Sequence, residues 1–350
     1  MPPEGTNAPF YGWRTEMVGT TNGGVDPTGG RREPAGRRTH GAAVLGLGLA
    51  AVGRPAYITS GRDGDLPGVR SIIALRARAH ALLDAAADLG ICFVDAARSY
   101  GLAEDFLGSW LRQRQEAPFV ASKWGYTYTA GWRVDAAQHE VKDHSSQSFE
   151  RQLAETSDLL APWLRLYQVH SLTLESPLWT DQELLERLAG LRAEGVDIGF
   201  STSGPGQAQA VRRGLEVTVD GTALFASVQT TWNLLEPSAG EALAEAHAAG
   251  VRVIVKEALA NGRLIDRRGA AGSRLDWLSR RHDVGIDAVA LAAALAQPWC
   301  DVVLCGAVTV PQLRSNAGAP ALAATIGATE LLPPESPEQY WFTRSQLAWR

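Results

Sequence analysis

The chain has 350 residues, 45% of them hydrophobic, and a formal net charge of −5 at neutral pH. A chain of this length can bury a large core, and a barrel of alternating strands and helices commonly takes about 250 residues as one domain. Nucleic-acid-binding proteins usually carry a basic face, so the net negative charge argues against a nucleic-acid partner. No apolar run in the sequence approaches the roughly 20 residues of a membrane-spanning helix.

The first part of the chain differs in composition from the rest. Residues 1–40 are rich in Gly, Pro, Thr and Arg and lack apolar periodicity, which predicts a disordered tail. The apolar run 41–53 follows two arginines, as in an export signal. Removing it would leave the later pattern one strand short, so we interpret it as the first strand and its loop, and we expect a cytoplasmic protein. The three cysteines, which lie in or beside apolar stretches, are expected to be reduced and buried.

From residue 41 onward, short apolar runs alternate with amphipathic segments. The runs are apolar throughout, as in parallel strands that are buried on both faces. The predicted strands are Ala43–Leu47, Cys92–Asp95, Phe119–Lys123, Leu166–His170, Asp197–Ser201, Phe225–Gln229, Arg252–Lys256 and Val302–Gly306. The predicted helices are Ala74–Leu89, Ser145–Leu160, Thr180–Arg192, Pro205–Arg213, Gly240–Ala249 and Asp287–Ala296. This order predicts one α/β domain, a (β/α)8 TIM barrel over residues 41–330, although periodicity alone does not exclude an open doubly wound sheet.

Three segments outside this pattern are expected to lie near the barrel mouth. Residues 124–146 and 261–285 are long loops after predicted strands, the second with a short helical stretch near Asp276–Arg281, and such loops usually carry function. Residues 331–350 form a C-terminal tail that we expect to pack near the mouth. His139 and His144 suggest a metal site in the first loop, but an exposed polar loop is the favoured interpretation.

Four polar side chains lie at or just after the carboxyl ends of three consecutive predicted strands. Asp95, Lys123 and His170 each end a strand, and Tyr100 follows in the loop after Asp95. In a barrel all four would point into one mouth. A lysine ammonium lowers the pKa of a nearby tyrosine, an aspartate pairs with a buried lysine, and a histidine can orient a carbonyl. Together they would make a general acid for a carbonyl that receives hydride.

Each of these residues has another interpretation when taken alone. Asp95 could cap a helix, Tyr100 could be a rim aromatic, Lys123 a surface lysine and His170 a core histidine. Their joint placement at consecutive strand ends favours a shared site.

The segment DAARSYGLAEDFLG resembles the signature of the aldo-keto reductase family, in which an aspartate is followed five residues later by tyrosine and glycine. VASKWG and LYQVHS resemble the strand-end lysine and histidine of that family. The resemblance extends from about residue 45 to about residue 319. It implies an NAD(P)-dependent enzyme that reduces an aldehyde or ketone to an alcohol, or the reverse. Tyr100 would donate the proton, Asp95 and Lys123 would adjust the pKa of Tyr100, and His170 would orient the substrate.

Two further segments resemble the part of the family that holds the nicotinamide. The resemblance implies that Ser201 and Gln229 bind its amide, with Thr202 where the family has asparagine. It also implies that Trp232 stacks on the ring in place of the usual tyrosine.

The segments VIVKEALANGRL and VVLCGAVTVPQLRSNAGA resemble the parts of the family that bind pyrophosphate and adenosine phosphate. The first contains Glu257, which we expect to bind a ribose hydroxyl or a loop amide, and Leu259. The second has family residues at Gly306, Thr309, Gln312 and Asn316. Val308 stands where a basic residue often contacts the 2′-phosphate, and Arg314 could substitute. We expect NADP as the cofactor, with NAD as the alternative.

Two other functions compete with an active reductase. The same fold could form a cofactor-binding regulatory or auxiliary subunit without significant turnover, or an unrelated barrel could be a lyase or a metal hydrolase. The complete tetrad favours the enzyme, with a small-molecule carbonyl or alcohol as its partner; the oligomeric state is not predicted. Aromatic residues expected to line the mouth are Trp124, Tyr126, Tyr128, Trp132, Tyr340, Trp341 and Trp349, which would suit sugars, hydroxy-ketones or aromatic aldehydes.

Overall fold

The computed structural model describes residues 42–59, 64–66, 70–267, 270–326 and 332–350. The predicted tail, residues 1–40, lies outside the described residues. The chain divides into the units Met1–Ala42 and Ala43–Arg350, and the second unit contains every helix and strand described below.

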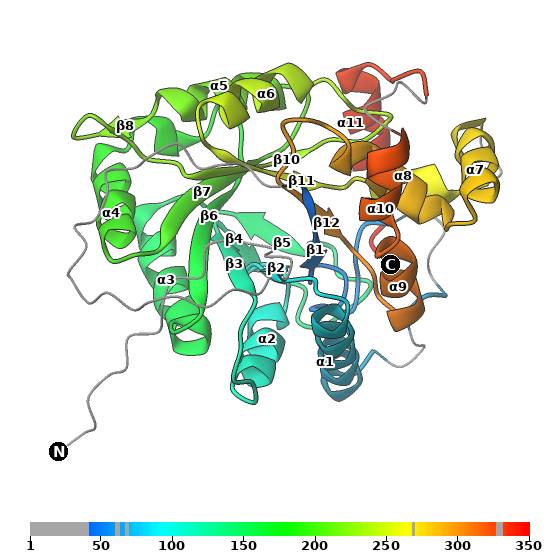
Figure 1. The fold of residues 1–350 in the computed structure, drawn as a ribbon. Helices are drawn as coiled ribbons and strands as arrows, with labels where there is room; N and C mark the ends of the chain where they lie inside the picture. The colour runs from blue at the N-terminus through cyan, green and yellow to red at the C-terminus, as the bar shows by residue number, and fades with distance from the viewer. Residues whose placement is uncertain (1–41, 60–63, 67–69, 268–269, 327–331) are drawn as a thin grey trace, which may run out of the picture. The chain divides into compact units, whose positions relative to one another are not determined.

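Eight parallel strands close into a barrel in the order β1–β12–β11–β10–β7–β6–β3–β2, and helices surround them (Figure 1). The strands are β1 (Val44–Gly48), β2 (Phe93–Asp95), β3 (Phe119–Trp124), β6 (Leu164–Leu172), β7 (Asp197–Thr202), β10 (Ser227–Thr231), β11 (Arg252–Lys256) and β12 (Val302–Cys305). Each predicted strand overlaps one of these. The (β/α)8 barrel is therefore confirmed, and the open doubly wound sheet is excluded.

The helices between the strands include all six that the sequence predicts. These are α1 (Ile72–Asp88), α3 (Ser146–Leu160), α4 (Gln182–Ala193), α5 (Gln207–Glu216), α6 (Gly240–Ala248) and α8 (Ile286–Leu295). Further helices are α2 (Ala103–Leu111), α7 (Ala270–His282), α9 (Val310–Asn316), α10 (Ala319–Ile326) and α11 (Pro337–Ser345), with 3-10 turns η1 (Pro177–Thr180) and η2 (Ala260–Ile265). Helix α2 begins after Leu102, whose side chain makes no capping hydrogen bond, so α2 lacks a common helix-start signal.

Two short hairpins lie outside the barrel. β4 (Tyr126–Tyr128) pairs with β5 (Glu140–Lys142) within the loop after β3, and β8 (Thr218–Val219) pairs with β9 (Thr222–Ala223). The first hairpin gives that loop a defined position beside the barrel mouth, because Glu140 lines the cavity described below.

The barrel interior is filled by a small apolar cluster that supports the site. The cluster consists of Phe93, Ala121, Leu166, Ile254, Val302 and Leu304. Side chains of a strand alternate between its two faces. The residues two positions later therefore point the same way, which places Asp95, Lys123, Gln168 and Lys256 directly above the cluster.

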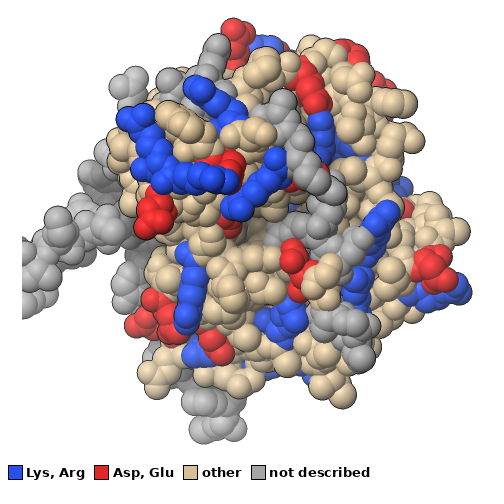
Figure 2. Space-filling model, turned by 90° about the vertical axis from the view of Figure 1, so that its right-hand side faces the viewer, with Lys and Arg blue, Asp and Glu red and all other residues tan. Residues whose placement is uncertain are grey.

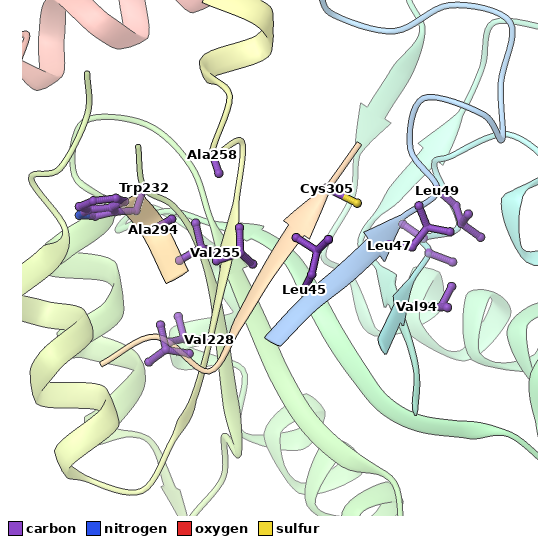
Figure 3. Packing of buried hydrophobic residues seen from close by; sticks show 14 of the residues in the cluster. Leu45, Leu47, Leu49, Val94, Val228, Trp232, Val255, Ala258, Ala294 and Cys305 are labelled. Atoms are coloured by element: carbon purple, nitrogen blue, oxygen red, sulfur yellow. The ribbon is translucent and has the colours of Figure 1, made fainter. Parts of the chain in front are cut away.

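A larger core packs between the barrel and its helices. Figure 3 shows part of it, with Val255 between Trp232 and Leu45 in this view. The Trp232 ring packs edge-on against Trp299, with 5.6 Å between the ring centroids. Cys300 and Cys305 are buried, as predicted, but Cys92 is exposed because it precedes β2 instead of belonging to it.

The surface carries charges of both signs. Figure 2, which views the side of the molecule at the right of Figure 1, shows basic and acidic side chains interspersed. On α7, for example, Asp276 forms ion pairs with both Arg267 and Arg280. Among the described residues, no helix has the length and apolar character needed to cross a membrane.

Candidate active site

A cavity opens at the carboxyl ends of the barrel strands, above the apolar cluster in the barrel. Asp95, Tyr100, His170 and Gln229 all line it. The sequence analysis placed Asp95, His170 and Gln229 at the ends of three different strands and Tyr100 in the loop after Asp95, and the barrel brings them to one place. Lys123 lies beneath them and is fully buried.

The base of the cavity is a buried ion pair. Lys123 Nζ lies 2.5 Å from Asp95 Oδ2 and donates a second hydrogen bond of 2.9 Å to the Ala96 carbonyl. The other carboxylate oxygen accepts from Gln229 Nε2 at 2.9 Å and from Gln168 Nε2 at 3.4 Å. Burial lowers the pKa of Lys123, and the Asp95 charge opposes that change. The pair is therefore well bonded on both sides, as buried charges require.

Tyr100 lies directly over this pair, with Lys123 Nζ 4.6 Å from the centroid of its ring. Its side chain is only 9% exposed. Burial, aided by Asp95, raises the pKa of Tyr100 well above its usual value, and Arg54 acts in the opposite direction. The net shift is upward, so the expected lowering by Lys123 does not set its direction; the negative charge of Asp95, the ion-pair partner of that lysine, acts against it. Tyr100 is thus held as a protonated phenol, the form that a proton donor needs.

His170 stands beside Tyr100. The two rings meet edge to face with 5.6 Å between their centroids, and Tyr126 packs on His170 at 5.0 Å. Burial, with the charges of Lys123 and Lys256, lowers the pKa of His170 well below its usual value. A neutral imidazole results, which can hydrogen-bond a substrate oxygen without adding charge.

Arg54, in the loop after β1, packs over Tyr100 from the side of the cavity. Its guanidinium carbon lies 5.2 Å from the Tyr100 ring centroid and 4.6 Å from that of Trp349. Its Nη1 donates to the Ser99 carbonyl at 3.0 Å and to Glu140 Oε2 at 2.9 Å. Arg54 thus joins the loop that carries Tyr100 to the β4–β5 hairpin and to the end of the chain.

Two glycines, Gly53 and Gly101, allow the loop after β1 and the loop after β2 to come into backbone contact. A Cβ on Gly53 would fall on the Tyr100 carbonyl oxygen and 2.5 Å from Ala103 Cβ. Gly101 has a φ of 63° and faces the Gly53 carbonyl in the same contact. The backbone of Tyr100 is therefore positioned by a contact that a side chain at residue 53 would break.

We expect Gly53→Ala to lower the free energy of unfolding by about 1–3 kcal/mol, because the added methyl group must displace backbone. The same displacement should reduce turnover, since it moves Tyr100. Gly190→Ala on α4 is the matched control, because a Cβ there meets nothing within 4 Å. Urea denaturation of both variants checks this; equal stability of the two would contradict the close contact seen here.

A second group of charged residues lies across the cavity at the end of β11. Lys256 Nζ donates to Thr231 Oγ1 at 2.7 Å. The Glu257 carboxylate forms an ion pair with Arg344 of α11, with Nη2 2.5 Å from Oε1, and among the described residues no loop amide donates to it. Burial acts to raise the pKa of Glu257, but Arg344 and Lys256 outweigh it and hold the pKa at about 2.

The structure separates the residues expected to bind the cofactor into two sets. The set that lines the cavity comprises Gln229, Glu257, Leu259 and Gly306. The set that is not among the described lining residues comprises Ser201, Thr202, Trp232, Thr309, Gln312 and Asn316.

Most of the second set is engaged within the protein. Ser201 Oγ accepts from the Ser171 amide at 2.8 Å, and Thr202 Oγ1 donates to Thr230 Oγ1 at 3.1 Å. Asn316 donates to Asp287. These contacts give each polar side chain a structural role in the described structure.

At the start of α9, Thr309 and Gln312 form a capping box. Gln312 Oε1 accepts from the Val308 and Thr309 amides at 2.9 and 3.2 Å. The side chains expected to meet a phosphate thus satisfy the helix end themselves.

The aromatic wall of the cavity differs from the expected one. Of the seven aromatic residues named from the sequence, only Trp349 is among the described residues that line the cavity. Tyr57, which was not named, also lines the cavity. Trp124 is fully buried against Phe149. Residues that the sequence analysis missed are Arg54, Tyr57, Lys256 and Arg344; only Lys256 had a signal, since it follows the inward-facing Ile254 by two positions.

The two histidines of the loop after β3 have packing roles. His139 stacks on Trp349 with 4.3 Å between the ring centroids, and His144 Nε2 lies 2.8 Å from the His170 carbonyl oxygen. Both are buried, so the expectation of an exposed loop is wrong for them. In the described part of the chain, no three His, Cys, Asp or Glu residues are grouped to hold a metal ion.

Comparison with known proteins gives one family and a consistent set of folds. The model of the Aldo/keto reductase family matches residues 75–326. A structure of a Pseudomonas aeruginosa protein classed as an aldo-keto reductase is 24% identical, with a TM-score of 0.57, over 84% of this chain and 94% of the other. The holo form of an aldo-keto reductase from Bacillus halodurans is 21% identical, with a TM-score of 0.58, over 86% and 91%. No curated protein sequence matches significantly.

Proposed function

Because this chain belongs to the aldo/keto reductase family, we propose that it is an NAD(P)-dependent oxidoreductase with Tyr100 as proton donor. It would interconvert a small-molecule aldehyde or ketone and the corresponding alcohol. The observation that carries this proposal is the position of Tyr100 and His170 side by side in the cavity, over the buried Asp95–Lys123 pair.

The cavity residues fit a nicotinamide dinucleotide. Gln229 offers an amide at the barrel end, and the cationic side chains of Lys256 and Arg344 also line the space. A Cβ on Gly306 would meet nothing within 4 Å, so the backbone there is open to a ligand. We propose that Gln229, Leu259 and Gly306 contact the cofactor, while Glu257 acts by holding Arg344.

The bound cofactor would supply or accept the hydride. In the reducing direction, the Tyr100 hydroxyl donates a proton to the carbonyl oxygen, and the neutral His170 ring hydrogen-bonds the same oxygen. The Lys123 ammonium stabilises the phenolate that remains, and Asp95 keeps that ammonium charged in a buried place. The aromatic rings and Arg54 exclude water from the reacting atoms.

The two cofactor candidates make different demands on α9. Arg314 is exposed on this helix, which supports NADP if its side chain reaches the 2′-phosphate. Val308 and the capping box of Gln312 support NAD, because neither offers a cation. We propose NADP first and NAD as the alternative.

Titration with NADPH and NADH, read by tryptophan fluorescence, together with turnover on a panel of aldehydes and ketones, tests the proposal. We expect saturable binding of at least one cofactor, tighter for NADPH, and oxidation of the bound cofactor when a carbonyl is added. Tighter NADH binding would select the alternative cofactor. Binding without turnover on any carbonyl or alcohol would favour a regulatory subunit, and binding of neither cofactor would overturn the proposal.

A further inference from the structure

Lys256 is a half-buried cation that the mechanism above does not use. It is one of three lysines in the chain, with Lys123 and Lys142. It ends β11, lines the cavity and donates its hydrogen bond to a neutral hydroxyl, that of Thr231. It therefore brings a positive charge to the part of the cavity opposite Tyr100 and His170.

The other charges around Lys256 occur in pairs of opposite sign. Glu257 on its own strand end pairs with Arg344 of α11, and Lys123 of β3 pairs with Asp95 of β2. In the described part of the chain, no carboxylate forms an ion pair with Lys256 Nζ. Each of these two carboxylates is paired with another cation, so they offset the charge of Lys256 only from outside an ion pair.

The charge of Lys256 reaches the reacting centre. It is among the charges that lower the pKa of His170 on β6. Hydride transfer requires the two reacting atoms to lie about 3–3.5 Å apart, so a nicotinamide that serves a carbonyl held by Tyr100 and His170 must share this mouth with Lys256.

We propose that Lys256 makes cofactor affinity depend on oxidation state, so that the protein binds the reduced nicotinamide more tightly than the oxidised one. The physical reason is charge: the oxidised ring is a cation and the reduced ring is neutral. Two like charges within one partly buried cavity repel each other strongly compared with the same charges in water. The proposal rests on the proposed function.

The consequence for the reaction is a bias in direction. An alcohol and an oxidised cofactor give a carbonyl, a reduced cofactor and one proton. If the protein holds the reduced cofactor more tightly, the equilibrium among bound species moves toward the carbonyl. Lys256 would thus favour alcohol oxidation on the protein relative to the same reaction in solution.

The same charge makes the bias depend on pH. Burial lowers the pKa of Lys256 to about 8; Glu257 and Asp95 oppose this change, and Arg344 and Lys123 add to it. Below that pH the lysine is charged and repels the oxidised ring, and above it the repulsion is lost. The phosphates are common to both forms, so their attraction to this lysine cancels in the ratio of the two affinities. The affinity for the oxidised cofactor relative to the reduced one should therefore rise between about pH 7 and pH 9.

The test is a titration of the full chain with oxidised and with reduced cofactor, read by tryptophan fluorescence from pH 6.5 to 9.5. Lys256→Met removes the charge, and Lys256→Arg keeps it throughout the range because arginine does not deprotonate. Lys142→Met is the matched control, since it removes a lysine charge from the exposed surface of β5.

At low pH we expect the ratio of the two Kd values to favour the reduced form about tenfold more in the wild type than in Lys256→Met, which equals about 1.4 kcal/mol. Lys256→Arg should keep that ratio at every pH, and Lys142→Met should match the wild type. An unchanged ratio and pH profile in Lys256→Met, or a wild-type profile in Lys256→Arg, would overturn this inference while leaving the proposed function intact. Failure of the wild type to bind either form would instead contradict the proposed function.

Discussion

Tyr100→Phe is expected to lower turnover by about 10²–10⁴-fold while leaving cofactor affinity within about twofold, because it removes the proton donor and little else. The phenylalanine ring keeps the contacts that the tyrosine ring makes with His170, Lys123 and Arg54. Steady-state rates and cofactor titrations on the same preparation measure both effects.

Tyr57→Phe is the control for this prediction. Tyr57 lines the same cavity, and its ring centroid lies 5.4 Å from the Arg54 guanidinium carbon, but it has no place in the proposed proton transfer. We expect a much smaller loss of turnover from it. Equal losses in the two variants would mean that Tyr100 is a wall residue and that another group supplies the proton.

Lys123→Met is expected to have the largest effect on stability, a loss of about 3–5 kcal/mol in the free energy of unfolding, because it leaves the Asp95 carboxylate buried without its cation. Asp95 is 2% exposed and, among the described residues, would keep only the side-chain amides of Gln229 and Gln168 as partners. Urea denaturation followed by circular dichroism measures the change.

The double variant Asp95→Asn/Lys123→Met separates stability from catalysis. With both charges removed, most of the lost stability should return, because no uncompensated charge is buried. Turnover should stay low, since the Lys123 ammonium that would stabilise the phenolate of Tyr100 is gone. If the single variant were as stable as the double variant, the pair would not be the buried base of the site.

The positions of the proposed catalytic residues were predictable because three of them, Asp95, Lys123 and His170, belong to strands with a clear apolar pattern. The inward-facing residues Phe93, Ala121 and Leu166 fill the barrel, so alternation alone carries Asp95 and Lys123 to the mouth. Tyr100 follows in the short loop between β2 and α2, which keeps it at the same end of the barrel as Asp95.

The other half of the cavity depends on contacts between segments far apart in the sequence. Glu257 finds its partner 87 residues later, in Arg344, and Arg54 finds Glu140 86 residues later. Periodicity indicates where a helix or strand lies along the chain, but it does not indicate which charged side chains will form ion pairs with each other. Arg54, Arg344 and the role of Glu257 could therefore not be predicted from the pattern.

Three of the residues expected to contact the cofactor, Thr309, Gln312 and Trp232, also carry ordinary structural signals. Thr309 and Gln312 have the spacing of a capping box, and they form one. Gln229 faces the cavity, and Thr231 faces Lys256, so alternation directs the next residue, Trp232, toward the helices and Trp299. The positions of these three residues are therefore explained by helix capping and core packing, without reference to a ligand.

Transfer of a label tests the central claim most directly. Reduced cofactor carrying deuterium at the nicotinamide C4 position is incubated with the protein and a panel of aldehydes and ketones, and the products are examined by mass spectrometry. The account predicts an alcohol that contains one deuterium, formed by the wild type and far more slowly by Tyr100→Phe. Absence of labelled alcohol from every carbonyl, although the cofactor binds, would contradict it and indicate a cofactor-binding protein without redox turnover.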